Sequence, residues 1–133
     1  MSAAAKPADP ASPRDVVMAF LKAMEPLDYD TAVTFIADDC DYQNMPMGAV
    51  TGPAGVRAVL EPFFKPTIEN EFRVLRSAAE GERVFVERLD RHRLESGWVE
   101  LPVTGVFEVK NGKITLWHDY FDLATIMSKW PAA

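Results

Sequence analysis

Hydrophobic residues recur every three or four positions through most of the first half of the chain, which is the period of an amphipathic helix. The first such stretch follows Ser12 and Pro13, a pair typical of a helix N-cap and first helical position. Prolines and a further N-cap residue, Asp28, divide the pattern into segments. We therefore predict three helices, from Pro13 to Pro26, from Asp28 through Ile36, and from Thr51 to Pro66.

The second half of the chain changes to β-branched and aromatic residues in alternation with polar ones, which indicates β-strands. Asn111-Gly112 lies between two such stretches and is a strong signal for a hairpin turn. The predicted strands cover residues 68–78, 84–94, 98–109 and 114–121, with a short strand at 40–45 before them and a short helix at 123–130 after them. Helices followed by a strand meander favour an α+β fold, in which an antiparallel sheet carries helices on one face and a curled sheet encloses a pocket.

Three charged residues interrupt strand faces that are otherwise apolar. Side chains two positions apart share one face of a strand, so Arg88 and Asp90 line up with Val84 and Val86. In the last predicted strand, Asp119 lies between two aromatic residues on the same face. Buried charge is unfavourable unless it is paired and hydrogen-bonded, so these residues are candidates for an active site.

The strand at 98–109 separates the two charged strands in a meander, and its Gly105 leaves space above it for long side chains to meet. One arginine can bridge two carboxylates, because its guanidinium presents five donors in a rigid fork. Burial raises a carboxylate pKa and a nearby cation lowers it, so two such acids can hold different protonation states. A site that keeps one acid protonated and the other ionised has a general acid and a general base ready together. A buried ion-pair network that only fixes strand register is the alternative.

Length and composition narrow the class of protein. The chain has 133 residues, of which 48% are hydrophobic, so we predict a single domain at 14–133. We predict a disordered tail at 1–13, since this segment lacks the apolar stretch of a signal peptide. The net charge of −6 disfavours nucleic acid as a partner. No apolar run approaches the roughly 20 residues of a membrane span. Cys40 is the only cysteine, which excludes an internal disulfide and favours a reducing, cytoplasmic location.

Motifs for metals and nucleotide cofactors are missing from the sequence. His92 and His118 are the only histidines, which is fewer than a zinc enzyme usually needs, and His92 is expected on the surface. No Gly-x-Ser-x-Gly elbow supports an α/β-hydrolase, and no Gly-x-Gly-x-x-Gly motif or P-loop supports a nucleotide cofactor. We therefore expect chemistry without a metal or a cofactor.

A further motif, Tyr42-x-Asn44, places a phenol and an amide on one face of the short strand at 40–45, where they can hold one water with a carboxylate as third partner. From about residue 14 to about residue 127 the chain resembles the limonene-1,2-epoxide hydrolase family in the order and spacing of its motifs. These motifs are Tyr42-x-Asn44, Arg88-x-Asp90, and Trp117-His118-Asp119-Tyr120-Phe121-Asp122 after Leu101-Pro102-Val103-x-Gly105-Val106-Phe107. One departure is His118, where relatives often carry arginine, but by alternation it points away from Asp119.

The resemblance implies a strongly curved mixed sheet, mostly antiparallel, with helices packed on its concave face: the cone-shaped barrel of NTF2-like (SnoaL-like) proteins. It also implies one-step hydrolysis of an apolar epoxide, cyclic or terpenoid-like as limonene 1,2-epoxide is, to a vicinal diol without a covalent intermediate. Asp119 would deprotonate a water held by Tyr42 and Asn44. Asp90 would protonate the epoxide oxygen, and Arg88 would bridge the two aspartates.

Apolar side chains are the candidates for contact with the substrate, although such residues more often form ordinary core. They are Met18, Met45, Phe63, Leu101, Val103 and Phe121. The resemblance also implies a homodimer through the outer face of the sheet. Two other functions stay open: an isomerase or polyketide cyclase on the same fold, which also uses an Asp and a Tyr, and a non-catalytic domain that binds a small molecule.

Overall fold

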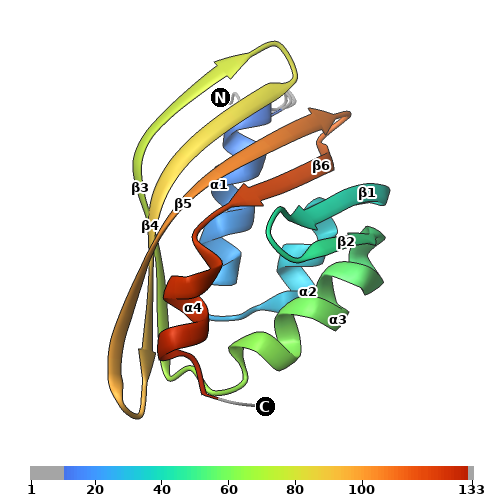
Figure 1. The fold of residues 1–133 in the computed structure, drawn as a ribbon. Coiled ribbons are helices and arrows are strands. Elements are labelled where there is room, and N and C mark those ends of the chain that lie inside the picture. Colours follow the sequence, from blue (N-terminus) through green and yellow to red (C-terminus); the bar gives the residue numbers. More distant parts are fainter. Residues whose placement is uncertain (1–10, 132–133) are drawn as a thin grey trace, which may run out of the picture.

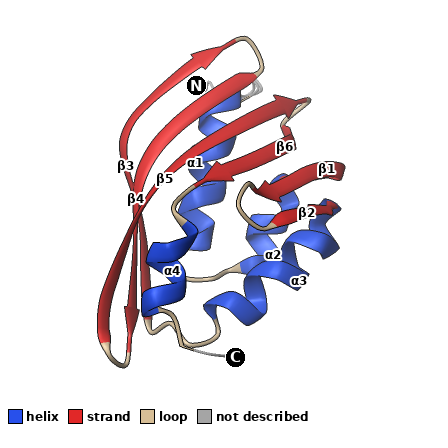
Figure 2. Ribbon diagram, in the orientation of Figure 1, coloured by secondary structure: helices blue, strands red, loops and turns tan. Residues whose placement is uncertain are grey.

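The computed structural model describes residues 11–131, which form a curved six-stranded sheet with helices packed against one face (Figures 1 and 2). The expected disordered tail at 1–13 lies mostly outside these residues, and Pro13 is the first residue of a helix. The helical elements are α1 (Pro13–Met24), α2 (Tyr29–Ala32), the 3₁₀ turn η1 (Val33–Phe35), α3 (Gly52–Phe64) and α4 (Leu123–Lys129). The strands are β1 (Ile36–Asn44), β2 (Gly48–Thr51), β3 (Glu69–Glu80), β4 (Arg83–Leu94), β5 (Gly97–Lys110) and β6 (Lys113–Tyr120).

The strands follow the order β2-β1-β6-β5-β4-β3, in which β1 and β6 run parallel and every other neighbouring pair runs antiparallel. This confirms the α+β class, the mixed sheet and the helices on its concave face, which Figure 1 shows with α1 lying across the long strands. Within the described residues β2 and β3 are free edges, so the sheet is a curved open cone and does not close into a barrel.

Local sequence signals explain the first helix. The Ser12 hydroxyl accepts a hydrogen bond from the Asp15 backbone N–H at 3.1 Å, which satisfies one of the free donors at the helix start. The apolar positions of α1 form one buried stripe toward the sheet, and the helix ends before Pro26 as predicted. The buried residues of this stripe are Val16, Val17, Phe20, Leu21 and Met24.

The second predicted helix is shorter than expected. Asp28 caps α2 through the Thr31 N–H, as predicted, but α2 has only four residues and continues into the 3₁₀ turn. Ile36 already belongs to β1, where it pairs with Ile114 of β6. The β-branched and aromatic residues at 33–36 lose side-chain freedom in a helix, and pairing with the sheet outweighs their helical spacing.

The first strand is longer than the predicted segment at 40–45, and β2 was not predicted. Asp38 and Asp39 are both exposed on β1, and the register to β6 shifts between Ile36 and Asp41. This irregularity interrupts the alternation of buried and exposed residues, so the sequence pattern does not show the first half of the strand. With only four residues, β2 is too short to give a periodic pattern. Its pairing with β1 nevertheless places Thr51 at the start of α3.

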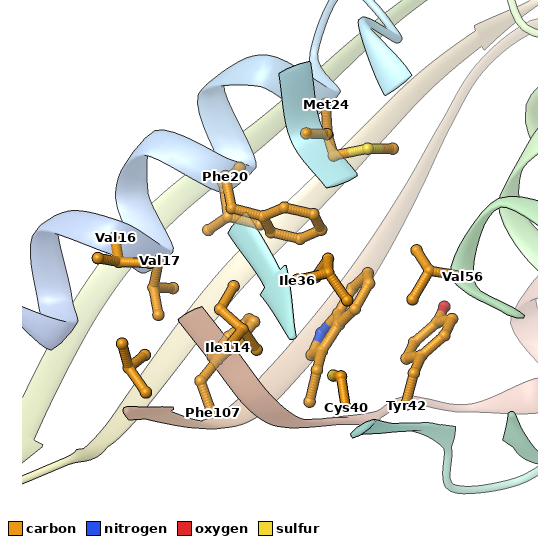
Figure 3. Packing of buried hydrophobic residues seen from close by; sticks show 14 of the residues in the cluster. Val16, Val17, Phe20, Met24, Ile36, Cys40, Tyr42, Val56, Phe107 and Ile114 are labelled. Carbon is orange, nitrogen blue, oxygen red and sulfur yellow. The ribbon is translucent and has the colours of Figure 1, made fainter. Parts of the chain in front are cut away.

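The main core lies between α1 and the concave face of the sheet, and Figure 3 shows its closely packed side chains. The Phe20 ring meets the Trp117 ring edge-on, with centroids 4.9 Å apart. Phe107 and Ile114 are fully buried beneath α1. Each large apolar side chain buried in this way contributes about 1.5–3 kcal/mol of transfer free energy, so the packing of α1 stabilises the face of the sheet on which the polar cluster lies.

Candidate active site

A cavity of about 150 Å³ lies on the concave side of the sheet and is enclosed by α1, α3 and α4. Most of its wall is apolar, with a small group of polar residues on the sheet side. The polar residues are Tyr42, Asn44, Arg88, Asp90, His92 and Asp119. An apolar pocket with a few convergent polar groups is the usual form of a small-molecule site.

Arg88 binds both aspartates through its guanidinium. It donates from Nε and Nη2 to the two carboxylate oxygens of Asp90, at 2.8 and 3.0 Å. It also donates from Nη2 and Nη1 to the two oxygens of Asp119, at 2.9 and 3.2 Å. The exposed fraction of each of these three side chains is 8% or less. The structure therefore brings together the three charged residues that the sequence singles out.

Strand register explains how Arg88 and Asp119 meet across β5. Gly105 pairs with Asp119 on one side and with Val86 on the other, so it lies directly under the ion pair. A Cβ atom on Gly105 would be 2.8 Å from Oδ1 of Asp119 and 2.9 Å from Nη1 of Arg88. The predicted space above Gly105 is therefore present, and the two charged side chains fill it.

Trp117 holds Asp119 from a third direction, and the sequence analysis assigned it no role. Its indole Nε1–H donates to Oδ1 of Asp119 at 2.8 Å. The ring is buried and stacks on Tyr42, with centroids 4.1 Å apart. The available signal was the spacing, because an aromatic donor two residues before the acid on one strand face can reach that acid.

The Tyr42-x-Asn44 motif lies next to Asp119 because β1 and β6 are parallel. Asn44 pairs with Asp119 in the register, and Tyr42 pairs with Trp117. The buried Tyr42 hydroxyl donates to Oδ1 of Asn44 at 3.2 Å. The backbone N–H of Met45 donates to the carbonyl oxygen of Asp119 at 2.9 Å, which fixes the end of β1 beside the carboxylate.

Burial changes the proton affinities of the site. It raises the pKa of Asp119 above its usual range, while the Arg88 charge and the hydrogen bonds from Arg88 and Trp117 oppose the rise. Burial, and next the Asp119 charge, also raise the pKa of Tyr42, so its phenol stays a hydrogen-bond donor at neutral pH. Desolvation alone would lower the pKa of Arg88, but the two carboxylates more than offset it and the guanidinium stays charged.

The structure separates the expected substrate-contact residues into two groups. The side chains of Phe63, Leu101, Val103 and Phe121 line the cavity. Met47 lines it as well, and so does Met24, which was not predicted. Met18 does not line it and packs instead against the core. Met45 follows the end of β1, is 38% exposed and does not line the cavity either. Helical periodicity does not tell which part of a buried stripe faces a cavity and which part faces the sheet.

The two histidines differ in their surroundings. His118 lies on the other face from Asp119, as expected, and its Nε2 is 3.0 Å from Oδ2 of Asp41. The prediction that His92 lies on the surface is wrong, because only 2% of the residue is exposed. His92 shares the inward face of β4 with Arg88 and Asp90, and that face stays buried along the strand.

Two other features of function, a metal-binding cluster and a membrane-spanning helix, are absent from residues 11–131. There is no cluster of three or more His, Cys, Asp or Glu residues in that range that could hold a metal ion. The helices of the same residues are all too short or too polar to cross a bilayer.

The curved cone-shaped sheet is the NTF2-like fold, and its cavity with two acids and one arginine is typical of a small-molecule enzyme. Residues 11–132 match the sequence model of the limonene-1,2-epoxide hydrolase catalytic domain. The epoxide hydrolase EphG of Mycobacterium tuberculosis (strain ATCC 25618 / H37Rv) is 36% identical over 107 residues, which cover 80% of this chain and 71% of EphG.

Solved structures agree with this match. The structure of an M. tuberculosis LEH-like epoxide hydrolase superimposes with a TM-score of 0.73 at 34% identity, over 85% of this chain and 84% of the other. A SnoaL-like structure from Shewanella putrefaciens CN-32 has a TM-score of 0.79 at 17% identity, over 88% and 94% of the two chains, which shows the fold alone. The chain belongs to the limonene-1,2-epoxide hydrolase family, and the protein is an epoxide hydrolase of that type.

Proposed function

We propose that the protein hydrolyses a small apolar epoxide to a vicinal diol in one step, with Asp119 as general base and Asp90 as general acid. The observation that carries the proposal is the pair of carboxylates held by one buried arginine at the polar end of an apolar cavity. An apolar epoxide fits the wall, and its reacting oxygen and carbon atoms would lie at the carboxylates. The family membership supports the same chemistry.

The water that attacks the ring is held beside Asp119. Asn44 is the register partner of Asp119, and Tyr42 contacts Asn44, so a water placed among the three has two acceptors for its protons. Asp119 removes one proton while the water oxygen forms a bond to an epoxide carbon. Positioned proton transfers of this kind contribute on the order of 10²–10⁴-fold each.

Asp90 completes the step at the opposite end of the breaking bond. The carbon–oxygen bond of the ring breaks, and the Asp90 proton passes to the alkoxide oxygen, which gives the second hydroxyl of the diol. Asp119 then holds one proton and Asp90 none, so a proton must return to Asp90 before the next turnover. Arg88 contacts both acids throughout, which keeps the pair close enough for this exchange.

Hydrogen bonding favours this division of roles between the acids. One cation between two buried carboxylates leaves one negative charge unbalanced, and a single proton on the pair cancels it. Among the residues that the structure describes, Asp119 accepts from Arg88 twice and from Trp117 once, whereas Asp90 accepts only the two bonds from Arg88. Donors stabilise the ionised form, so the hydrogen bonds favour Asp119 as the base, against the effect of burial on its pKa, and we assign the role of the acid to Asp90.

The size of the cavity supports a compact substrate. A cavity of about 150 Å³ with an apolar wall accepts a ring of about the size of benzene, which favours the smaller members of the proposed substrate class. That class is cyclic or terpenoid-like epoxides, of which limonene 1,2-epoxide is an example. Phe63, Leu101, Val103 and Phe121 would contact the hydrocarbon part. No cofactor or metal is needed for these steps.

A single-turnover reaction in ¹⁸O-labelled water tests this mechanism. With enzyme in excess over cyclohexene oxide or limonene 1,2-epoxide, we expect the diol of the first turnover to carry the label, because water attacks the ring directly. An unlabelled diol in that turnover would show a covalent ester on a carboxylate and would overturn the one-step mechanism. Turnover of a ketosteroid with none of any epoxide would favour the isomerase alternative.

Replacement of Trp117 by phenylalanine is expected to move the acidic limb of the pH profile of kcat/KM to higher pH. The indole hydrogen bond lowers the pKa of Asp119, so its loss raises that pKa further. The base works only when ionised, hence activity is present above this pKa and is lost as the pH falls through it. Trp98→Phe is the control, because Trp98 is partly exposed on the outer face of the sheet. An acidic limb that stays in place would show that Trp117 does not act on the base.

Replacement of Gly105 by alanine is expected to lower kcat/KM by about 10²-fold. The new methyl group would push Asp119 and Arg88 apart, and displacement of a catalytic group by about 1 Å has an effect of this size. Thr104→Ala is the matched control, since the neighbouring side chain is exposed on the other face of β5. Wild-type kinetics of Gly105→Ala, with thermal unfolding measured in parallel, would contradict the proposed geometry.

We also propose a homodimer in the cytoplasm, formed through the outer face of the sheet. Phe85 and Trp98 are exposed on that face, at 42% and 40%, and supply apolar area for a contact. The single cysteine, Cys40, is buried and suits a reducing compartment. Sedimentation equilibrium tests the dimer, and Phe85→Lys is expected to shift it toward the monomer.

A further inference from the structure

His92 is a buried polar residue in the cavity wall that the proposed hydrolysis does not use. It follows Asp90 by two positions on β4 and lines the same cavity. Three aromatic rings surround it, with centroid distances of 5.2 Å to Phe64, 5.8 Å to Phe72 and 5.3 Å to Trp130. A polar group in such surroundings is unfavourable unless it has partners, so its hydrogen bonds are informative.

A chain of hydrogen bonds sets the orientation of the His92 ring. The Thr67 hydroxyl donates to the carbonyl oxygen of Phe64 at 2.7 Å and accepts from Nδ2 of Asn70 at 3.0 Å. This direction turns Oδ1 of Asn70 toward His92, where Nδ1 lies 2.7 Å away. An amide oxygen only accepts, so Nδ1 carries the proton. Nε2 of the neutral ring is then an acceptor with a free lone pair.

The free nitrogen faces the cavity. Within residues 11–131, Nε2 has no hydrogen-bond partner, and no fully buried side-chain nitrogen or oxygen in that range lacks one. Nε2 is therefore accessible, and since His92 lines the cavity and is only 2% exposed, the cavity is where that access lies. The site is thus an acceptor among aromatic side chains of the cavity wall, beside the polar group that contains Asp90.

We propose that Nε2 of His92 accepts a hydrogen bond from the substrate, and that the substrate is an epoxide with one hydroxyl or N–H donor at the end remote from the ring oxygen. This inference rests on the proposed epoxide hydrolysis and names the substrate class. The Cα atoms of residues two apart on one strand face are about 7 Å apart, so the donor lies several ångströms from the epoxide oxygen that Asp90 protonates.

The charge state of the ring limits the choice of donor. Burial, with a smaller effect of the Arg88 charge, lowers the pKa of His92 to about 4, so the ring is neutral at pH 7. A neutral acceptor binds a neutral donor such as an alcohol or an amide N–H and gives no attraction to a carboxylate or a phosphate. The proposed substrate is therefore an uncharged molecule, apolar except for its epoxide and one donor.

Two epoxides that differ in one group test the inference. The stereoisomers of 4-(hydroxymethyl)cyclohexene oxide and of 4-ethylcyclohexene oxide match in size, but only the first has a donor. We expect the wild-type enzyme to favour the hydroxylated epoxide, mainly through a lower KM. In His92→Phe the ratio of the two kcat/KM values should fall about tenfold, the effect of one hydrogen bond. His92→Gln, which restores an acceptor, should regain part of the ratio.

His118→Leu is the control, because it removes the other histidine on the opposite face and should leave the ratio unchanged. If both epoxides are hydrolysed but His92→Phe has the same ratio as wild type, the inference is overturned while the proposed function stands. If neither epoxide is hydrolysed, the proposed function fails for this class, and a binding measurement decides the role of His92.

The binding measurement uses the ¹⁵N resonances of the two histidines, of which His118 is the internal reference. The product diols of the two epoxides are added to the wild-type protein. We expect the hydroxymethyl diol to move the Nε2 resonance of His92 toward that of a protonated nitrogen, and the ethyl diol to leave it in place. Equal shifts with both diols, or no shift with either, would overturn the inference.

Discussion

Asp119→Asn is expected to lower kcat for epoxide hydrolysis by about 10⁴-fold or more, which is the largest effect on activity that the structure predicts. The asparagine keeps the size of the side chain but is no base, so the water is not deprotonated, and proton transfer alone supplies up to about 10⁴-fold. The hydrogen bonds from Arg88 and Trp117 to Oδ1 can persist, so the fold should be retained. Initial rates of diol formation measure the effect.

Asp39→Asn is the matched control for this change. Asp39 is exposed on β1, so the same chemical replacement there should leave kcat unaltered. Asp90→Asn should also be nearly inactive, because the epoxide oxygen would lose its proton donor. Activity of Asp119→Asn within tenfold of wild type would show that another group activates the water and would refute the assignment of the base.

Arg88→Met is expected to lower the free energy of unfolding by about 3–5 kcal/mol at pH 7, the largest effect on stability. The side chain is 1% exposed, and its loss leaves two buried carboxylates without a counter-charge. The Arg88 charge lowers the pKa of Asp119, so that pKa rises further in the variant. A carboxyl group whose pKa is raised in the folded state contributes its full stability to the fold below its unfolded pKa and loses that contribution as the pH rises. The difference in the free energy of unfolding between wild type and Arg88→Met should therefore shrink toward acid pH.

Urea denaturation at several pH values measures this difference. Arg93→Met is the control, because Arg93 lies on the same strand and its side chain, which pairs with Glu69, is 40% exposed. Solvent screens the charges of such a pair, so this variant should lose little stability. The triple variant Arg88→Met/Asp90→Asn/Asp119→Asn should recover part of the loss, since no buried charge remains. An Arg88→Met protein as stable as wild type at pH 7 would contradict the buried network.

Much of the site could be predicted because it depends on alternation along strands. The inward positions of Arg88, Asp90 and Asp119 follow from the period of two, and hairpin connections place Gly105 between them. These rules are local, and the structure confirms them. The proximity of Tyr42-x-Asn44 to the acids came only from the family resemblance, because the parallel pairing of β1 with β6 joins segments far apart in the chain.

The remaining features depend on packing between distant elements. His92 was expected on the surface, although alternation gives it the same strand face as Arg88 and Asp90. Its burial depends on the aromatic side chains of α3, β3 and the segment after α4. Met18 and Met24 both belong to α1, and only the path of that helix across the sheet brings Met24 to the cavity. The short α2 likewise reflects competition from sheet pairing that no local pattern records.

Strand pairing, including the parallel register of β1 and β6, places the proposed catalytic side chains on the sheet, apart from the helix residues of the cavity wall. All five proposed catalytic side chains belong to strands that hydrogen bonds join into one sheet, whereas much of the hydrocarbon wall comes from the helices. Libraries at helix positions such as Leu60, Phe63 and Ile126 can therefore vary the accepted epoxide without touching a catalytic side chain. An engineer would thus begin with the helix residues of the cavity wall, because none of the five proposed catalytic side chains lies on a helix.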